Sequence, residues 1–278
     1  MVSSIPEDDR PDGAPATPLW MCPFAGRIVL LQDLQDVTGL QRGVGMVWSP
    51  GSAVKWWLLR RGIRVQRATK FDYLFARLMA RYPGRPFVQV GANDGVRFDD
   101  LYGAVLRHGL RGLAIEPLPD YFTRLVQAYA HQPGVVPVQV AVHPTASTAT
   151  IYRLDPTHAA AYPAWVEGCA SFLRSHLLGL GVAEAHLLAE TVPCQPLMAL
   201  LTAQGMLEAT YLQVDTEGFD AEVLRMVDFT RFRPLLIKYE HAHLSATDQG
   251  AMQALLRGQG YALVTEREDT IAWRPEIA

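Results

Sequence analysis

The chain has 278 residues, enough for one large α/β domain with appendages or for two small domains. Apolar residues make up 49% of the sequence and charged residues 19%, so a sizeable hydrophobic core can form. The net charge of −3 gives no reason to expect a nucleic-acid partner, and no apolar run reaches the roughly 18 residues that a membrane span needs.

The cysteine content indicates a reducing compartment. Cys22, Cys169 and Cys194 are odd in number and show no spacing typical of a metal site. A disulfide framework is therefore not expected, and the cytoplasm is the expected localisation. The sequence predicts no particular oligomeric state.

The first third of the chain divides into a tail and an extension. Residues 1–20 are rich in proline and are expected to form a disordered or loosely docked tail. In the extension, residues 21–85, apolar side chains at helical spacing predict a helix at about 69–82, which Pro83-Gly84 would stop. The main domain is expected to cover residues 86–278.

From residue 86 onward, apolar runs alternate between the spacing of strands and the spacing of helices. The expected strands are 87–91, 112–116, 135–142, 211–215 and 234–240, and the expected helices lie at about 99–108, 119–130, 196–204, 219–227 and 247–258, the last with Thr247 as its N-cap. An extra strand could end at Leu154, and strands at 261–265 and 270–273 would form a closing hairpin. The pattern predicts an α/β fold with a C-terminal antiparallel hairpin.

A glycine-flanked turn follows the first of these strands. The apolar run Phe87–Val90 breaks into the turn Gly91–Gly95, and the second strand ends on Glu116. Bare backbone at Gly91 lets a ligand approach closely, and Glu116 can accept hydrogen bonds from ribose hydroxyls, so the unit suits a nucleoside-bearing cofactor. A dehydrogenase would need glycine where this chain has Asn93, which favours a cofactor without a pyrophosphate.

Five segments in order carry a resemblance to a known family. They are Gly91–Gly95, Glu116-Pro117, Val140–Val142, Val214–Gly218 with Glu222–Leu224, and Arg233-Pro234 leading into Glu240. Together they resemble the FkbM-type S-adenosylmethionine-dependent methyltransferases, over residues 86 to 245 or so. The resemblance implies a class I methyltransferase (Rossmann-like) sheet and methyl transfer, usually to a hydroxyl oxygen of a sugar or polyketide-type small molecule.

The cofactor implied is S-adenosylmethionine, with Ala141 or its neighbours near the adenine. The residues expected to bind it are Gly91, Ala92, Asn93, Asp94, Glu116, Pro117, Ala141 and Asp215. The C-terminal hairpin agrees with this reading, because it sets methyltransferase sheets apart from dehydrogenase sheets.

The segment at about 155–192 interrupts the alternation. An insertion of this size in a compact domain is usually a lid or a substrate-binding subdomain, and we expect it to cover the site and to select the methyl acceptor. Tyr162, Trp165 and Phe172 are expected to be lid core more than a sugar-stacking platform, and Ser171 and His176 could reach the acceptor.

Two carboxylates are expected to carry the chemistry. Asp215 and Glu240 end the fourth and fifth strands, where ligands of open α/β sheets bind, so they should face the sulfonium. Asp215 could instead cap the next helix, and Glu240 could instead form a structural salt bridge. Glu217 is equally compatible with a cap and with a role in the site.

The acceptor's proton must also be removed, and the sequence leaves two routes open. His241 or His243, just after Glu240, could act as the general base. Alternatively, Asp215 and Glu240 with a histidine could bind a Mg²⁺ ion that orients a substrate diol and lowers its hydroxyl pKa.

The hypothesis favoured by the sequence is an S-adenosylmethionine-dependent O-methyltransferase for a small molecule. Two alternatives are a nicotinamide-dependent oxidoreductase on a Rossmann-like fold and a catalytically inactive cofactor-binding scaffold. Asn93 and the closing hairpin argue against the first, and the retention of Asp215 and Glu240 argues against the second.

Overall fold

The computed structural model describes residues 19–22, 27–30, 69–97, 99 and 101–278. The chain divides into two units, residues 1–76 and 77–278. In the first unit, β1 (Leu19–Cys22) and β2 (Arg27–Leu30) pair in antiparallel fashion. Most of the tail expected over residues 1–20, and much of the extension over 21–85, lies outside the described residues.

Helix α2 (Lys70–Arg81) lies where the sequence predicts a helix at about 69–82. Its first turn is closed by two reciprocal hydrogen bonds: the Asp72 backbone N–H donates to Thr69 Oγ1 at 3.0 Å, and the Thr69 N–H donates to Asp72 Oδ2 at 2.9 Å. This capping box, with Asp in the place of Glu, satisfies two backbone donors at the helix start.

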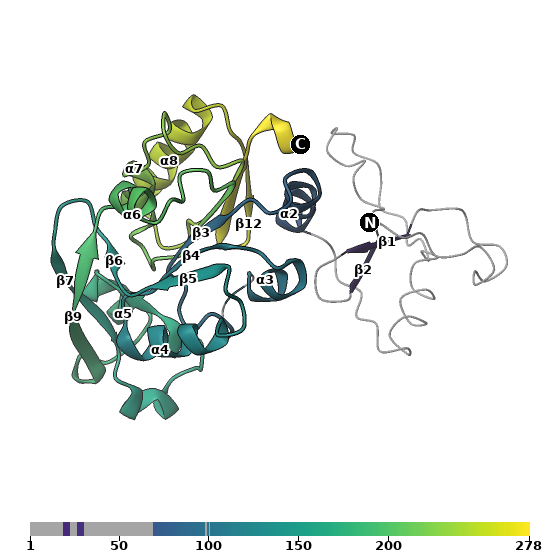
Figure 1. The fold of residues 1–278 in the computed structure, drawn as a ribbon. Coiled ribbons are helices and arrows are strands. Elements are labelled where there is room, and N and C mark those ends of the chain that lie inside the picture. The colour runs from purple at the N-terminus through teal and green to yellow at the C-terminus, as the bar shows by residue number, and fades with distance from the viewer. Residues whose placement is uncertain (1–18, 23–26, 31–68, 98, 100) are drawn as a thin grey trace, which may run out of the picture. The chain divides into compact units, whose positions relative to one another are not determined.

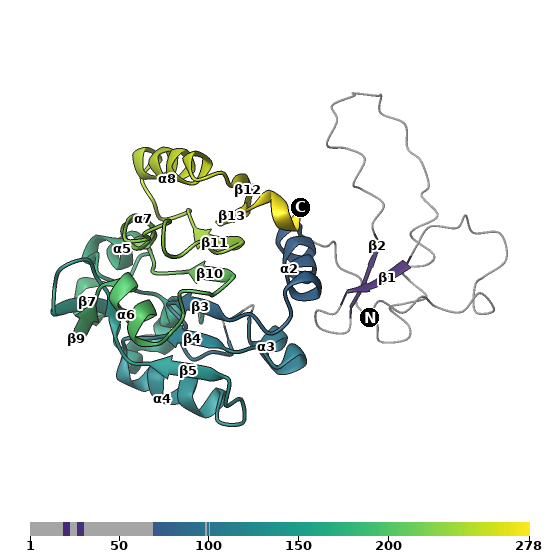
Figure 2. The same ribbon diagram turned by 45° about the horizontal axis from the view of Figure 1, so that its top comes forward.

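A seven-stranded sheet forms the centre of the second unit (Figures 1 and 2). Its strands are β3 (Phe87–Val90), β4 (Gly112–Ile115), β5 (Val135–Val138), β10 (Tyr211–Val214), β11 (Leu236–Glu240), β12 (Ala262–Glu266) and β13 (Asp269–Trp273), in the spatial order β12-β13-β11-β10-β3-β4-β5. Only β13 runs against the other six, because it pairs antiparallel with both β11 and β12. The predicted C-terminal hairpin is thus β12 and β13.

The register of the central strands aligns their carboxyl ends. Val90 lies opposite Ile115 of β4 on one side and Val214 of β10 on the other, and Val214 lies opposite Tyr239 of β11. The residues that follow these positions therefore meet at one edge of the sheet. That edge is where open α/β sheets bind ligands.

Helices cover both faces of the sheet. Their bounds are α3 (Tyr102–His108), α4 (Pro119–Ala128), α6 (Leu197–Ala203), α7 (Asp220–Arg225) and α8 (Ala246–Gly258). Buried side chains of α6, α7 and α8 pack with Val88 and Val90 in one apolar cluster. Gln89 points to the opposite face, where its Nε2 donates to Asp99 Oδ1 at 3.0 Å and Tyr129 OH, just after α4, donates to Asp99 Oδ2 at 3.2 Å.

The predicted cap of α8 is wrong by two residues. Ser245, and not Thr247, caps the helix: its Oγ accepts from the Asp248 N–H at 3.1 Å and donates to Asp248 Oδ2 at 2.7 Å. Both residue types can serve as caps, and the bond to Asp248 decides between them.

A second, four-stranded sheet follows β5. It contains β6 (Ala141–Val142), β7 (Thr148–Leu154), β8 (Ala170–Ser171) and β9 (Leu187–Gln195), in the order β6-β9-β7-β8. The single strand expected over 135–142 is therefore two strands, because Ala141 and Val142 leave the large sheet and pair with Cys194 and Gln195.

The same sheet redefines the insertion. Strand β7 pairs with β9 along its whole length, from Thr148 opposite Pro193 to Leu154 opposite Leu187, so the inserted unit begins before residue 155 and ends after residue 192. The segment between these strands contains η2 (Pro156–Ala161), η3 (Val166–Gly168), β8, α5 (Arg174–Gly179) and η4 (Glu184–His186), and the last element of the chain is η5 (Pro275–Ile277). Leu154, Val166 and Leu177 belong to a small apolar core of its own.

Candidate active site

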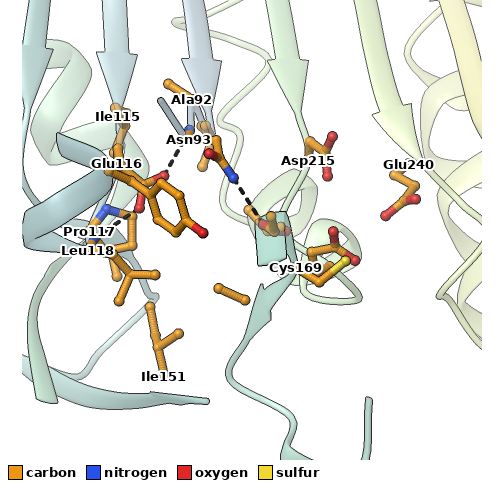
Figure 3. Close-up of a pocket in the computed structure, with 18 of the residues that line it drawn as sticks. Ala92, Asn93, Ile115, Glu116, Pro117, Leu118, Ile151, Cys169, Asp215 and Glu240 are labelled. Carbon is orange, nitrogen blue, oxygen red and sulfur yellow. Dashed lines mark hydrogen bonds between the residues drawn. The ribbon is translucent and has the colours of Figure 1, made fainter. Parts of the chain in front are cut away.

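A cavity of about 610 Å³ opens at the carboxyl ends of β3, β4, β10 and β11 (Figure 3). The inserted unit contributes Trp165, Cys169 and Phe172 to its wall, and Ala141 and Ile151 form an apolar stretch of the lining. Its volume lies within the roughly 300–1,000 Å³ that is typical of small-molecule and cofactor sites.

The turn after β3 brings two strand ends into backbone contact. Gly91 has a φ of 82°, which favours glycine, and its N–H and that of Ala92 both donate to the Ile115 carbonyl, at 3.0 and 2.9 Å. A Cβ atom on Gly91 would lie 1.7 Å from the Asp215 carbonyl oxygen. A side chain at this position would therefore force apart the strand ends that line the cavity.

Glu116 holds this turn from the end of β4. Its Oε2 accepts from the Asn93 N–H and its Oε1 from the Leu118 N–H, both at 2.9 Å (Figure 3). Burial raises the pKa of Glu116 to about 7, although the two backbone donors act in the opposite direction. The carboxyl group lines the cavity and so can meet a ligand there.

The inserted unit is tied to the same turn. Asn93 Nδ2 donates to the Gly168 carbonyl at 2.9 Å, Arg97 Nη1 lies 3.2 Å from Glu167 Oε2, and the Tyr121 hydroxyl donates to the Glu167 carbonyl. Gly168 lines the cavity with Asn93. The wall that the inserted unit contributes is thereby fixed to the glycine turn.

Asp94, a predicted cofactor ligand, does not line the cavity; it holds Arg97, which pairs with Glu167 of the inserted unit. Its Oδ1 accepts from the Val96 and Arg97 N–H groups, and its Oδ2 lies 2.6 Å from Arg97 Nε. The other predicted cofactor residues, namely Gly91, Ala92, Asn93, Glu116, Pro117, Ala141 and Asp215, all line the cavity.

Asp215 and Glu240 lie at the ends of β10 and β11, on the same side of the opening (Figure 3). Burial, together with the nearby carboxylates of Asp215, Glu217 and Asp220, raises the pKa of Glu240 to about 10. The protein atoms around Asp215 partly remove water from its carboxylate, and this desolvation raises the pKa of Asp215 well above its usual range. The side chain is nevertheless accessible from the cavity.

The fully buried carboxylate of Asp220 forms hydrogen bonds with residues at the ends of both β10 and β11. Its Oδ2 accepts from Thr216 Oγ1 at 2.8 Å and its Oδ1 from the Glu240 N–H at 3.2 Å. These bonds orient the residues after β10 and the end of β11 relative to each other. The N-cap position of α7 is occupied by Phe219, and no side chain caps this helix by a hydrogen bond.

The two predicted histidines lie in different places. His243 lines the cavity, with its Nε2 3.4 Å from Glu240 Oε1 and 3.5 Å from Glu217 Oε2. Partial burial lowers the pKa of His243, although Glu217 acts against this. His241 does not line the cavity: its Nδ1 lies 3.1 Å from Thr270 Oγ1 of β13.

The inserted unit contributes Ser171 and His176, which the sequence suggested could reach the acceptor, and Cys169, which it did not single out as a site residue. His176 Nε2 of α5 lies 2.9 Å from Glu217 Oε2, and the buried Ser171 hydroxyl donates to the Glu217 carbonyl at 2.7 Å. Cys169 lines the cavity as a free thiol, and burial raises its pKa well above the usual range, so it stays protonated. The only signal of these contacts in the sequence is the polar turn Thr216-Glu217-Gly218 beside a long insertion.

The strand order with one reversed strand, the glycine turn and the buried acid at the end of β4 define a class I S-adenosylmethionine-dependent methyltransferase. A model of the methyltransferase FkbM domain matches residues 89–263, more than half of the sequence. The chain belongs to this family. Membership favours methyl transfer over both a nicotinamide-dependent oxidoreductase and an inactive scaffold.

The solved structures that match the chain are distant from it in sequence. The precorrin-6y C5,15-methyltransferase of Geobacter metallireducens is 11% identical, with 72% of this chain and 85% of that chain covered and a TM-score of 0.38. The fibrillarin pre-rRNA processing protein of Methanococcus jannaschii is 12% identical, with 99% of this chain and 97% of that chain covered and a TM-score of 0.39. An RNA methyltransferase of Salinibacter ruber, in complex with S-adenosyl-L-homocysteine, is 14% identical, with 74% of this chain and 92% of that chain covered and a TM-score of 0.36.

No curated protein matches the chain. Among the described helices, none combines the length and the apolar character that crossing a membrane requires.

Proposed function

We propose that the chain is an O-methyltransferase that transfers the methyl group of S-adenosylmethionine to a hydroxyl of a sugar or polyketide-type small molecule. The observation that carries this proposal is one cavity that joins a glycine turn and a buried acid on one side to the carboxylates Asp215 and Glu240 on the other. Its volume suits a cofactor together with a small acceptor better than a large, flat partner.

The cofactor is proposed to lie along the ends of β3 and β4. Its ribose hydroxyls would donate to Glu116, its adenine would lie beside Ala141, and its methionine part would cross the bare backbone of Gly91. Because Gly91 touches the Asp215 backbone, a cofactor held in this way ends beside the Asp215 side chain. That places the sulfonium near the two carboxylates.

The transfer itself is an in-line displacement. The acceptor oxygen forms a bond to the methyl carbon, the bond from carbon to sulfur breaks, and its electron pair stays on sulfur to give the thioether. Asp215 is proposed to take the hydroxyl proton, since its side chain is open to the cavity. Glu240, whose pKa of about 10 keeps it protonated at neutral pH, would position the acceptor by a hydrogen bond.

Calorimetric titration and a transfer assay test the proposal. We expect S-adenosylhomocysteine to bind and NAD not to bind, and we expect labelled methyl groups to move from S-adenosylmethionine to members of a panel of sugars and polyketide-type alcohols. Transfer to RNA in the absence of transfer to any small molecule would overturn the acceptor class. Absence of S-adenosylhomocysteine binding would overturn the placement of the cofactor.

The inserted unit is proposed to select the acceptor, and Trp165 offers a direct test. Its side chain is half exposed and lines the cavity mouth. We expect Trp165→Ala to raise the acceptor KM by roughly 2- to 10-fold, since aromatic contacts contribute about 0.5–1.5 kcal/mol beyond burial, with no change in cofactor affinity. Leu178→Ala is the matched control, because Leu178 is exposed on the same unit but does not line the cavity. Equal acceptor KM values for both variants would show that Trp165 does not contribute to acceptor binding.

A further inference from the structure

Three side chains from separate elements converge beside the cavity. His176 comes from α5, Glu217 from the turn after β10, and His243 from the turn after β11. One possible ligand atom of each lies within 4.8 Å of those of the other two. The predicted pair, Asp215 and Glu240, is not part of this cluster.

The spacing of these atoms suits a metal ion. Glu217 Oε2 lies 2.9 Å from His176 Nε2 and 3.5 Å from His243 Nε2. Ligands bound tetrahedrally at about 2.0–2.2 Å stand roughly 3.4 Å apart, so the first distance needs to widen by only about 0.5 Å. The His176 and His243 rings meet edge to face, with their centroids 4.3 Å apart, so they approach Glu217 from different directions.

The turn that carries Glu217 is held in an uncommon conformation. Glu217 has a φ of 52°, in the left-handed region that a residue other than glycine rarely adopts. The buried Ser171 hydroxyl fixes this backbone by donating to the Glu217 carbonyl at 2.7 Å, and it also accepts from the Leu173 N–H at 3.1 Å. The inserted unit therefore supplies both one ligand, His176, and the group that orients another.

A second carboxylate lies beside the cluster: Glu240 Oε1 is 3.4 Å from His243 Nε2. The buried Glu240 Oε2 has no hydrogen-bond partner among the described residues. A cation bound to the cluster would balance the negative charge of Glu217, and its open coordination position would face the cavity that Glu217 and His243 line.

We propose that His176, Glu217 and His243 bind one divalent first-row transition metal ion, with Zn²⁺ as the best match, which holds the acceptor's hydroxyl oxygen. This rests on the proposed function of the cavity. Two imidazole nitrogens and one carboxylate form a set that Zn²⁺ uses with a fourth position open, whereas Mg²⁺ prefers oxygen ligands. The ion lowers the pKa of a bound hydroxyl, so that Asp215 can remove its proton.

Metal titration of tag-free, chelator-treated full chain tests this proposal in the absence of any cofactor. We expect one Zn²⁺ per chain by calorimetry, visible absorption bands on replacement by Co²⁺, and no comparable binding of Mg²⁺. His176→Ala and Glu217→Gln should each weaken Zn²⁺ binding by at least 10- to 100-fold. His131→Ala, which removes an exposed histidine outside the cluster, should leave it unchanged.

The outcomes separate this site from the cofactor site. Zn²⁺ binding that is absent, or equal in the ligand variants and in His131→Ala, overturns the metal proposal even if S-adenosylhomocysteine still binds. If His176→Ala fails to fold by circular dichroism, His243→Asn decides, because His243 lies on an exposed turn. Loss of S-adenosylhomocysteine binding in the wild type with intact Zn²⁺ binding would instead overturn the proposed function.

Discussion

Asp215→Asn is expected to lower kcat by roughly 10²- to 10⁴-fold, the range that a positioned base contributes. Glu240→Gln is expected to lower kcat less, because an amide can still donate a hydrogen bond to the acceptor. An alcohol is a weak nucleophile at neutral pH, so its proton must leave as the bond from oxygen to carbon forms. Asn at position 215 cannot accept that proton. Gln at position 240 keeps the shape of the side chain but changes its hydrogen bonding to the acceptor.

Single-turnover methyl transfer, measured at saturating cofactor, checks this expectation. Both variants should retain S-adenosylhomocysteine binding and cooperative thermal unfolding. Glu208→Gln is the control, because Glu208 is an exposed carboxylate just before the other end of β10, where it pairs with Arg85. Near-normal turnover in both folded variants would show that neither Asp215 nor Glu240 carries the chemistry, and the catalytic groups would then have to lie in the inserted unit.

Glu116→Gln is expected to weaken S-adenosylhomocysteine binding by tenfold or more at pH 8. A hydrogen bond from a ribose hydroxyl to an ionised carboxylate contributes about 1.5–3 kcal/mol, and the amide replaces it with a neutral bond. The backbone donors of Asn93 and Leu118 also lose one of their two acceptor oxygens.

The pH dependence of this effect has a definite sign. Burial raises the pKa of Glu116 to about 7, so the wild-type side chain is ionised above that pH and protonated below it. Wild-type affinity should therefore increase as pH rises through 7, while the affinity of Glu116→Gln stays flat. Calorimetry between pH 6 and pH 8 measures both, and parallel curves for the two proteins would show that Glu116 does not contact the cofactor as an anion.

Local patterns in the sequence were sufficient to predict the large sheet. Buried parallel strands appear in the sequence as short apolar runs, such as Phe87–Val90 and Tyr211–Val214. The turn residues that follow each run mark the carboxyl end of the strand. The neighbours Gly91, Glu116 and Asp215 could be predicted to meet because parallel strands end at the same edge. The cavity lining contains all three.

The smaller sheet and the histidine cluster could not be predicted in this way. Strand β6 has only two residues, and its partner β9 lies about 50 positions further along the chain, so no local spacing reveals the pair. His176 approaches Glu217 only because β7, β8 and β9 fold the inserted unit back over the strand ends. A contact of this kind depends on tertiary packing and leaves no periodic trace.

Asn93 joins both sides of the cavity through two hydrogen bonds, one from its backbone N–H to Glu116 and one from its side chain to the Gly168 carbonyl. A ligand that moves this residue on the cofactor side therefore also moves the wall on the acceptor side. Thermodynamic linkage makes such coupling reciprocal. The affinity for the acceptor is thus expected to change when the cofactor binds, and the affinity for the cofactor to change by the same factor when the acceptor binds.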